Sequence, residues 1–375
     1  MIQPLSGPWA RPGQIAAMGA QLAADEINAA GGVKALGGAK IRLVTADSGD
    51  TSDKAKSAAQ RLLGDNPDMC GGVGGYVSLF TLAITEITER NDLPWIDFAY
   101  SDTITNRGFK YVFQTSPTGG QQAEAALPTL VELIKVAGAK LPTKAGIVMD
   151  NTPSPASFSK PMRDGGLSKF GMTLAVDEVY TPPLSDASPI AQRVRAARVG
   201  LLIFLPTAVS DIKLVLEGLS EVGMNRTRLP VLGNGSPMGS SDLLKIAGKE
   251  TMDGLMFIAA DWESKNTADV ATRFRQKTGE PWMSQDALMN YGHVWILKEA
   301  VEQAGSADRH KVNDTLHAMD LTTGPALLFP GKRIKFQENG RLLGASIVIV
   351  QWQGGVPKVV YPTDIAVAAP VWGGS

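Results

Sequence analysis

The sequence predicts an α/β protein in which mostly parallel sheets are flanked by helices. Strand-like and helix-like segments alternate along most of the 375 residues, which is the order that builds parallel sheets with helices on both faces. At about 150 residues per domain, this length favours two domains over one. Hydrophobic residues make up 44% of the chain, an ordinary globular fraction, so each domain can bury a core.

The first run of strand and helix units covers residues 1–110. Apolar residues at helical spacing predict helices, and short apolar runs between them predict strands. The expected helices are Gln14–Ala30, Lys54–Leu63 and Leu79–Arg90, and the expected strands are Ile41–Val44, Gly72–Gly74 and a segment that begins at Pro94–Ile96. This order predicts a first parallel sheet.

A second run of the same kind begins near Gln121 and predicts a second sheet. Its expected helices are Gln121–Ala137, Phe158–Phe170, Ile190–Ala197 and Ser210–Val222, and its expected strands are Ala145–Met149, Thr173–Val176, Gly200–Leu205, Leu229–Leu232 and Leu255–Ile258. Two proline-rich stretches, Thr152–Pro155 and Thr181–Pro183, are expected to be stiff surface loops.

The last third of the chain changes character. Two helical patterns, Ala268–Lys277 and Asp286–Ala304, come first. Three alternating segments then follow at Arg333–Phe336, Ala345–Gln351 and Lys358–Val360, a pattern typical of antiparallel strands.

Composition excludes several classes of function. The 36 Lys and Arg residues balance 37 Asp and Glu residues, so the chain has no net positive charge that would attract nucleic acid. The single cysteine, Cys70, and 3 histidines exclude a disulfide framework and offer no metal-ligand spacing, and we expect neither a metal nor a cofactor. The longest apolar run is Leu201–Leu205, which ends at Pro206. It is far shorter than a membrane helix, which needs about 20 residues. Met1–Pro4 lacks the features of a leader peptide, so none is expected within this chain.

No enzyme motif is complete. Gly72–Gly74 resembles part of a dinucleotide fingerprint, but Val77 stands where its third glycine belongs. Gly235–Gly239 does not match the nucleophile elbow of hydrolases, and we place no histidine near a strand end to serve as a base. We therefore expect no catalytic residues and no enzymatic activity.

Binding chemistry is predicted at the carboxyl ends of the strands, where ligands bind in open parallel sheets. Ser78 directly precedes a helical pattern, so it is a candidate N-cap beside free backbone N–H groups, which attract anions. Ser101 follows the strand that begins at Pro94 and adds a second hydroxyl at the same edge. Two hydroxyls without a nearby Lys or Arg suit a carboxylate better than a phosphate. The alternative is that Ser78 only caps its helix.

Three aromatic residues occupy the same loops: Trp9, Tyr76 and Tyr100. Each one alone is better explained by packing beneath its loop, because an exposed ring is costly. Together, and beside two hydroxyls, they favour an apolar and aromatic ligand.

The chain also resembles the leucine/isoleucine/valine-binding protein family, the type I periplasmic solute-binding proteins that serve ABC importers. The matching segments keep their order and spacing along nearly the whole length. They are Leu5–Pro8, Ile27–Val33, Arg107–Phe113, Ala247–Gly248, Tyr291, Gly324–Pro325 and Glu338–Gly340.

The resemblance implies two α/β lobes joined by three crossovers, with ligand held by hinge closure. The expected first lobe is residues 1–119 with 256–323, and the expected second lobe is residues 120–255 with 324–375. It also implies that Ser78, Ala99 and Ser101 hold the ligand's carboxylate and part of its amino group. Two of these positions, Ser78 and Ser101, are the serines found independently from the strand ends.

The second lobe departs from the family pattern. The acidic residue that pairs with a ligand ammonium is replaced by Gly235, and the family's pocket tyrosine is replaced within Pro206–Ala208, where Thr207 is the candidate contact. Asn151 and Ser154, after the strand Ala145–Met149, complete the candidate contacts. A buried ammonium without a counter-charge would cost several kcal/mol, so we expect an aromatic monocarboxylate such as a benzoate, a phenyl keto acid or a cinnamate-like acid.

Several alternatives remain open at this point. Asp242 or Asp261 would restore an amino-acid ligand if either supplied the missing charge. The leading hypothesis is a monomeric periplasmic receptor for a small carboxylate, recognised by the membrane permease subunits of an importer. Alternatives are branched-chain amino acid binding for the same kind of importer, a cytoplasmic sensor of amides or small acids on the same fold, and an α/β enzyme that acts on acyl groups.

Overall fold

The structure is a computed structural model that describes residues 1–136, 138–225 and 228–372. The chain forms two compact units, one of Met1–Pro117 with Asn266–Ser346 and the other of Thr118–Lys265 with Ile347–Ser375. It passes from one unit to the other three times, at residues 117–118, 265–266 and 346–347.

These boundaries differ from the expected ones in two places. Residues 256–265 belong to the second unit, because the strand Met256–Ala259 pairs with strands of that unit on both sides. Residues 324–346 belong to the first unit, because Ile334–Lys335 pairs with Asp320–Leu321.

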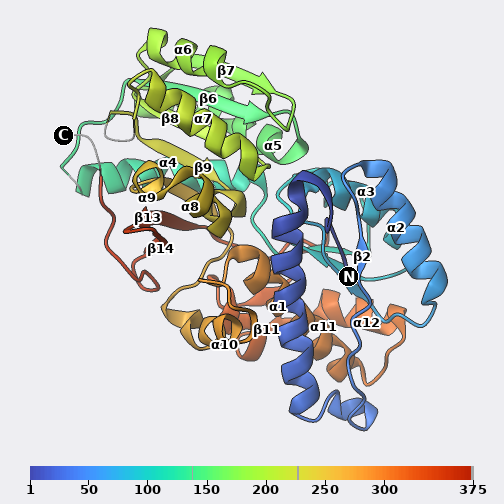
Figure 1. Cartoon of the computed structure of the whole chain (residues 1–375). Coiled ribbons are helices and arrows are strands. Elements are labelled where there is room, and N and C mark those ends of the chain that lie inside the picture. The colour runs from blue at the N-terminus through green and yellow to red at the C-terminus, as the bar shows by residue number, and fades with distance from the viewer. Residues whose placement is uncertain (137, 226–227, 373–375) are drawn as a thin grey trace. The chain divides into compact units, whose positions relative to one another are not determined.

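The first unit contains short parallel strands (Figure 1). β1 pairs with β2, β3 pairs with β4 and β4 with β5, and a bridge from Ile2 to Gly74 joins the two groups. These strands are β1 (Ile2–Gln3), β2 (Ala46–Asp47), β3 (Gly72–Val73), β4 (Trp95–Asp97) and β5 (Val112–Gln114). A separate antiparallel pair consists of β11 (Asp320–Leu321) and β12 (Ile334–Lys335).

Helices cover this unit's strands with apolar faces. Two of them, α2 (Ser52–Asp65) and α3 (Ser78–Arg90), pack together over a core that includes Phe80 and Trp95. The remaining helices are α1 (Ala10–Ala29), α10 (Ala268–Thr278), α11 (Gln285–Ala304) and α12 (Arg309–Ala318). Gly19 lets α1 lie directly against α11, since a Cβ atom at Gly19 would stand 2.1 Å from the carbonyl oxygen of Ala287.

The predicted strand Ile41–Val44 is wrong, because β2 covers only Ala46–Asp47. Its neighbour β1 offers just Ile2 and Gln3 for pairing, so the apolar run before Ala46 lacks a strand beside it. The Met1 amine donates a hydrogen bond to the Val44 carbonyl over 2.7 Å, where a longer pairing would continue.

The second unit is built on one sheet of seven strands in the order β14-β13-β10-β9-β8-β6-β7 (Figure 1). The strands from β10 to β7 are parallel, and β13 and β14 run antiparallel at one edge, as the alternation near the chain's end predicts. They are β6 (Lys144–Asp150), β7 (Thr173–Tyr180), β8 (Leu201–Leu205), β9 (Val231–Asn234), β10 (Met256–Ala259), β13 (Val348–Gln353) and β14 (Val356–Tyr361).

One face of this sheet forms a core with two helices. Phe158 and Leu127 pack there on alternate residues of the strands, such as Ile147 and Ile203, because successive strand residues point to opposite faces. The helices of the unit are α4 (Gly119–Val136), α5 (Pro153–Pro161), α6 (Ser188–Ala197), α7 (Val209–Glu221), α8 (Ser241–Ala247) and α9 (Lys249–Met252).

The predicted helix Phe158–Phe170 and the predicted loop Thr152–Pro155 are both corrected. Helix α5 begins at Pro153 after an extended Thr152, because proline is well tolerated in a first helical turn. It ends at Pro161, and Gly165 then adopts a φ of 106°, which an α-helix does not allow. Thr181–Pro183 is a loop, as predicted. No helix within the described residues is long and apolar enough to cross a membrane.

Candidate functional site

The first unit brings two serines together at the carboxyl ends of β3 and β4. The Ser101 backbone N–H donates to Ser78 Oγ over 3.1 Å, and the two residues are 1% and 2% exposed. Ser78 is the first residue of α3 and not its N-cap, which corrects the expected role. Val77 occupies the cap position in extended conformation, and the Ser78 hydroxyl binds the Ser101 loop instead of its own helix.

Each of the two serine hydroxyls accepts a hydrogen bond and keeps its own proton available to donate. Ser78 Oγ accepts from Ser101, and Ser101 Oγ accepts from the Thr103 backbone N–H over 3.3 Å. A serine hydroxyl has one proton to donate. Among the hydrogen bonds between described residues, neither hydroxyl is a donor. The edge therefore presents two O–H donors side by side, an arrangement that suits the two oxygens of a carboxylate.

Ala99 lies in the turn between these features. Its N–H donates to Asp97 Oδ1 over 2.9 Å, which folds the chain tightly after β4. Its carbonyl accepts hydrogen bonds from Gln114 Nε2 over 2.5 Å and from Ser116 Oγ over 3.3 Å. Burial raises the pKa of the Asp97 carboxyl well above its usual range.

The three aromatic residues have different surroundings. Trp9 is 7% exposed and packs edge-to-face on Phe80, with ring centroids 5.4 Å apart, as expected for a core ring. The Tyr100 hydroxyl donates to Gln285 on α11, and its ring is buried. Tyr76 is half-buried. Contact of these rings with a ligand stays a prediction.

A buried histidine beneath this edge escaped the sequence reasoning. His293 on α11 places Nε2 at 2.7 Å from Thr115 Oγ1, directly after β5, so a histidine does lie near a strand end. The Thr115 hydroxyl also bonds to the Asp97 carbonyl over 3.1 Å. Burial lowers the pKa of His293 to about 3, so the ring is neutral. Position in sequence gave no signal, because 178 residues separate the two partners.

The second unit gathers its candidates around Asp150, which the sequence reasoning also missed. Its Oδ1 accepts from the Thr152 N–H over 2.9 Å and from the Thr152 hydroxyl over 2.5 Å. Its Oδ2 accepts from the Thr207 N–H over 2.7 Å and from the Thr207 hydroxyl over 2.6 Å. Burial raises the pKa of Asp150, and the threonine hydrogen bonds oppose that shift. The carboxyl thus fixes the loops after β6 and β8.

The other candidates of this unit lie along the same edge. Asn151 is exposed and donates from Nδ2 to Thr181 Oγ1 over 2.9 Å. Ser154 is half-buried in the first turn of α5. Gly235 follows β9 with a φ of 88°, and its N–H donates to the Ile258 carbonyl over 2.8 Å. The structure thus places Asn151, Ser154, Thr207 and Gly235 after β6, β8 and β9.

Two acids were considered as substitutes for the missing charge near Gly235. Asp261 follows β10, is 2% exposed, and accepts the Trp262 N–H at Oδ1 over 2.8 Å. Burial raises its pKa well above the usual range, so the neutral form is favoured. Asp242 lies on α8 and pairs with Lys245 at 3.3 Å. A role for either acid toward a ligand stays a prediction.

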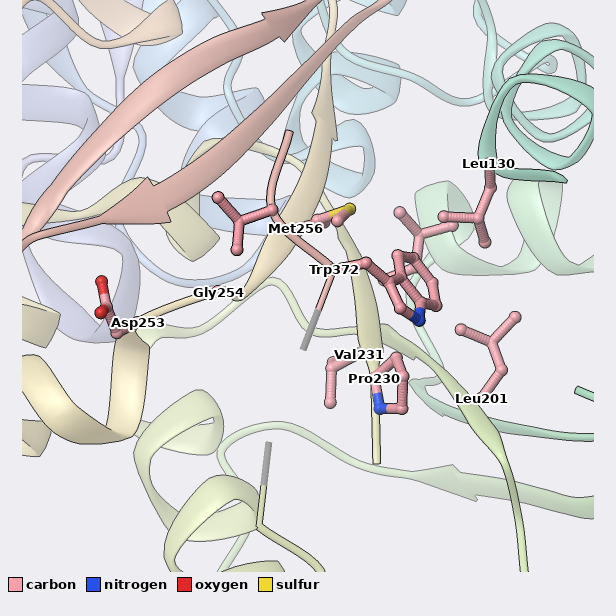
Figure 2. A pocket seen from close by; sticks show the side chains of 10 residues that line it. Leu130, Leu201, Pro230, Val231, Asp253, Gly254, Met256 and Trp372 are labelled. Carbon is pink, nitrogen blue, oxygen red and sulfur yellow. The ribbon is translucent and has the colours of Figure 1, made fainter. Parts of the chain in front are cut away.

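Each unit also has a partly open pocket elsewhere. In the second unit, Figure 2 shows Trp372 beside Leu201, Val231 and Met256, which are the first residues of β8, β9 and β10. This cavity of about 80 Å³ is therefore at the amino ends of the strands, opposite the candidate residues. A cavity of about 250 Å³ in the first unit is lined by the 39–44 segment, the start of β3 and α11. No group of three potential metal ligands occurs in the described ranges.

Comparison with known proteins agrees with this architecture. The family described as periplasmic binding protein matches residues 1–356. A Leu/Ile/Val-binding protein homolog 8 from Brucella melitensis biotype 1 is 26% identical over 377 residues, which covers 98% of this chain and 91% of that protein.

Solved structures share the fold at low sequence identity. A branched-chain amino acid transporter substrate binding protein from Streptococcus pneumoniae, in complex with isoleucine, has a TM-score of 0.81 at 19% identity and covers 95% of this chain and 96% of its own. A solute binding protein of an ABC transporter from R. palustris, in complex with benzoate, has a TM-score of 0.79 at 17% identity, with 98% and 95% covered. The predicted fold class and family resemblance are confirmed.

Proposed function

Because the chain belongs to the periplasmic binding protein family, we propose that it is the periplasmic solute receptor of an ABC importer and binds a small apolar monocarboxylate. An aromatic acid is the leading candidate. The proposal includes capture by closure of the two units, delivery by a monomeric receptor to the importer's permease subunits, and no catalytic step.

The pair of serine donors is the observation that supports a carboxylate ligand. Ser78 and Ser101 each accept a backbone N–H and retain an O–H to donate. No positive side chain is needed to bind one carboxylate when two hydroxyls and a helix amino terminus face it. The two serines recognise only the carboxylate group of the ligand. The adjacent Tyr100 and Tyr76 favour a ring as its apolar part.

Relatives supply the second candidate. The names of the relatives in Brucella point to leucine, isoleucine and valine, and the neighbour from Streptococcus pneumoniae holds isoleucine. The neighbour from R. palustris holds benzoate, so both ligand classes occur on this fold. Gly235 after β9 favours the acid without an amine, because glycine offers no counter-charge.

A thermal-shift panel tests the proposal. Benzoate, hydroxybenzoates, phenyl keto acids, cinnamates, leucine, valine and small amides are each added to the purified protein in excess. A ligand at a hundredfold excess over its Kd stabilises the protein by about 2.7 kcal/mol, which is a shift of a few degrees. A shift with aromatic acids alone supports the proposal. A shift with leucine or valine alone contradicts it and favours the amino-acid receptor, and a shift with amides alone favours the sensor.

A further inference from the structure

We propose that Gln114, assisted by Ser116, makes this site reject ligands that carry an ammonium group, by occupying the backbone acceptors beside the two serine donors. The inference rests on the proposed function, because it concerns the same site. It adds the residues that set the specificity, and neither of them was among the residues expected to contact the ligand.

The acceptors at this edge are already in use. A carbonyl oxygen has two lone pairs for hydrogen bonds. The Ala99 carbonyl receives Gln114 Nε2 at 2.5 Å and Ser116 Oγ at 3.3 Å, which fills both. Gln114 Nε2 also reaches the Ser101 carbonyl at 3.3 Å. An ammonium group has only donors, so it would have to displace one of these bonds.

Gln114 cannot easily turn away. It is completely buried, and its Oε1 accepts from Thr105 Oγ1 over 2.9 Å. That hydroxyl in turn accepts from Arg341 Nε over 2.7 Å. Because Thr105 donates to Oε1, the amide is fixed with its NH₂ group toward the Ala99 and Ser101 carbonyls. The backbone of Gln114 is held as well, since its N–H donates to the Gly340 carbonyl over 2.9 Å.

In each unit, one carboxyl group behind the strand-end loops is unsuited to pair with an ammonium. Asp97 holds the Ala99 N–H with one oxygen, and its other oxygen is sealed from solvent. In the second unit, Asp150 uses both oxygens to hold Thr152 and Thr207. Beside Asp97 or Asp150 a ligand cation would lose its hydration without gaining an ionic partner, which is strongly unfavourable. Apart from the sealed Asp97 Oδ2, the acceptors named here are already used within the protein.

Two ligand pairs that differ only in the ammonium group provide the test. They are 3-phenylpropanoate against phenylalanine, and 4-methylpentanoate against leucine. Isothermal titration calorimetry gives Kd for each compound with the wild-type protein. The inference expects the acid to bind at least about 100-fold more tightly than its amino counterpart in any pair that binds. An amino acid that binds as tightly as its acid would overturn the inference while leaving a solute receptor in place.

Two variants assign the selectivity to the named residues. Gln114→Met keeps the length of the side chain and removes its donors, and Ser116→Ala removes the second bond to Ala99. Thr115→Val is the matched control, since it removes the hydroxyl bonds to the Asp97 carbonyl and to His293 but leaves both bonds to the Ala99 carbonyl. Melting curves establish that each variant is folded.

We expect the ratio of the two Kd values to fall about tenfold or more in Gln114→Met, and by a smaller factor in Ser116→Ala. Thr115→Val should keep it within about twofold. Ser116→Ala keeps the test valid if Gln114→Met does not fold. An unchanged ratio in the folded variants contradicts the inference while the proposed function stands. If none of the four compounds binds and no aromatic acid of the thermal-shift panel shifts the melting temperature, the proposed ligand class is rejected, and this inference with it.

Discussion

Replacing Ser78 with alanine removes a hydroxyl that has two separate roles in this account. It accepts the Ser101 N–H over 3.1 Å within the protein, and it is proposed to donate to the ligand carboxylate. Loss of a charge-assisted hydrogen bond costs about 1.5–3 kcal/mol, which corresponds to a roughly 10- to 150-fold weaker Kd. The buried Ser101 N–H would also lose its partner, so the unfolding free energy should fall by about 1–3 kcal/mol.

Titration calorimetry and urea denaturation separate these two effects. Thr51→Ala is the matched control, because Thr51 caps α2 through the Lys54 N–H at 3.3 Å and lies outside the candidate site. It should lower stability by about 1 kcal/mol and leave Kd unchanged. If Ser78→Ala lost stability but bound the acid as well as the wild type does, Ser78 would be a structural residue only and the carboxylate site would lie elsewhere.

Three further predictions concern stability. Asp150→Asn keeps only one acceptor oxygen for two loops, so the urea midpoint should fall by the equivalent of about 2 kcal/mol or more, and an unchanged midpoint would contradict the role given to that carboxyl. His293 has a folded pKa lowered to about 3, so its contribution is present above the unfolded value of about 6.5 and is lost as pH falls toward 3. His293→Gln should therefore flatten the acid slope of stability by up to about 1.4 kcal/mol per pH unit, and a slope equal to that of the wild type would refute the buried neutral ring. Gly19→Ala should lower the melting temperature because its Cβ would overlap the α11 backbone, whereas Gly64→Ala, with open space around its Cβ, should leave it equal or raise it; equal effects would disprove the close helix contact.

Most of the fold could be predicted because the spacing of apolar residues within one segment is enough to identify a helix or a strand. Helical spacing located α2, α3 and α7 to within a few residues, and apolar runs located β6 and β8. Ile41–Val44 failed because a strand also needs a neighbour, and its partner β1 is only two residues long. Proline was interpreted as a loop signal at Pro153, although the same residue starts helices well.

The candidate site was predictable in part for the same reason. Ser78 and Ser101 meet because carboxyl ends of adjacent parallel strands share one edge, which needs no knowledge of distant contacts. Gln114 and His293 act through partners that their own sequence neighbourhood does not reveal, since Arg341 lies 236 residues from Thr105 in the network that holds Gln114. In the sequence, Asp150 does not differ from any other acid that follows a strand. Only the structure shows that it holds the loops of Thr152 and Thr207.

The most direct test of the central claim is a crystal structure of the protein with the acid that gives the largest thermal shift. The account predicts that the ligand carboxylate lies within hydrogen-bond distance of both Ser78 Oγ and Ser101 Oγ, with Gln114 still bound to the Ala99 carbonyl. A ligand amine seated on the Ala99 carbonyl or on the Asp261 carboxylate would contradict it and identify an amino-acid receptor.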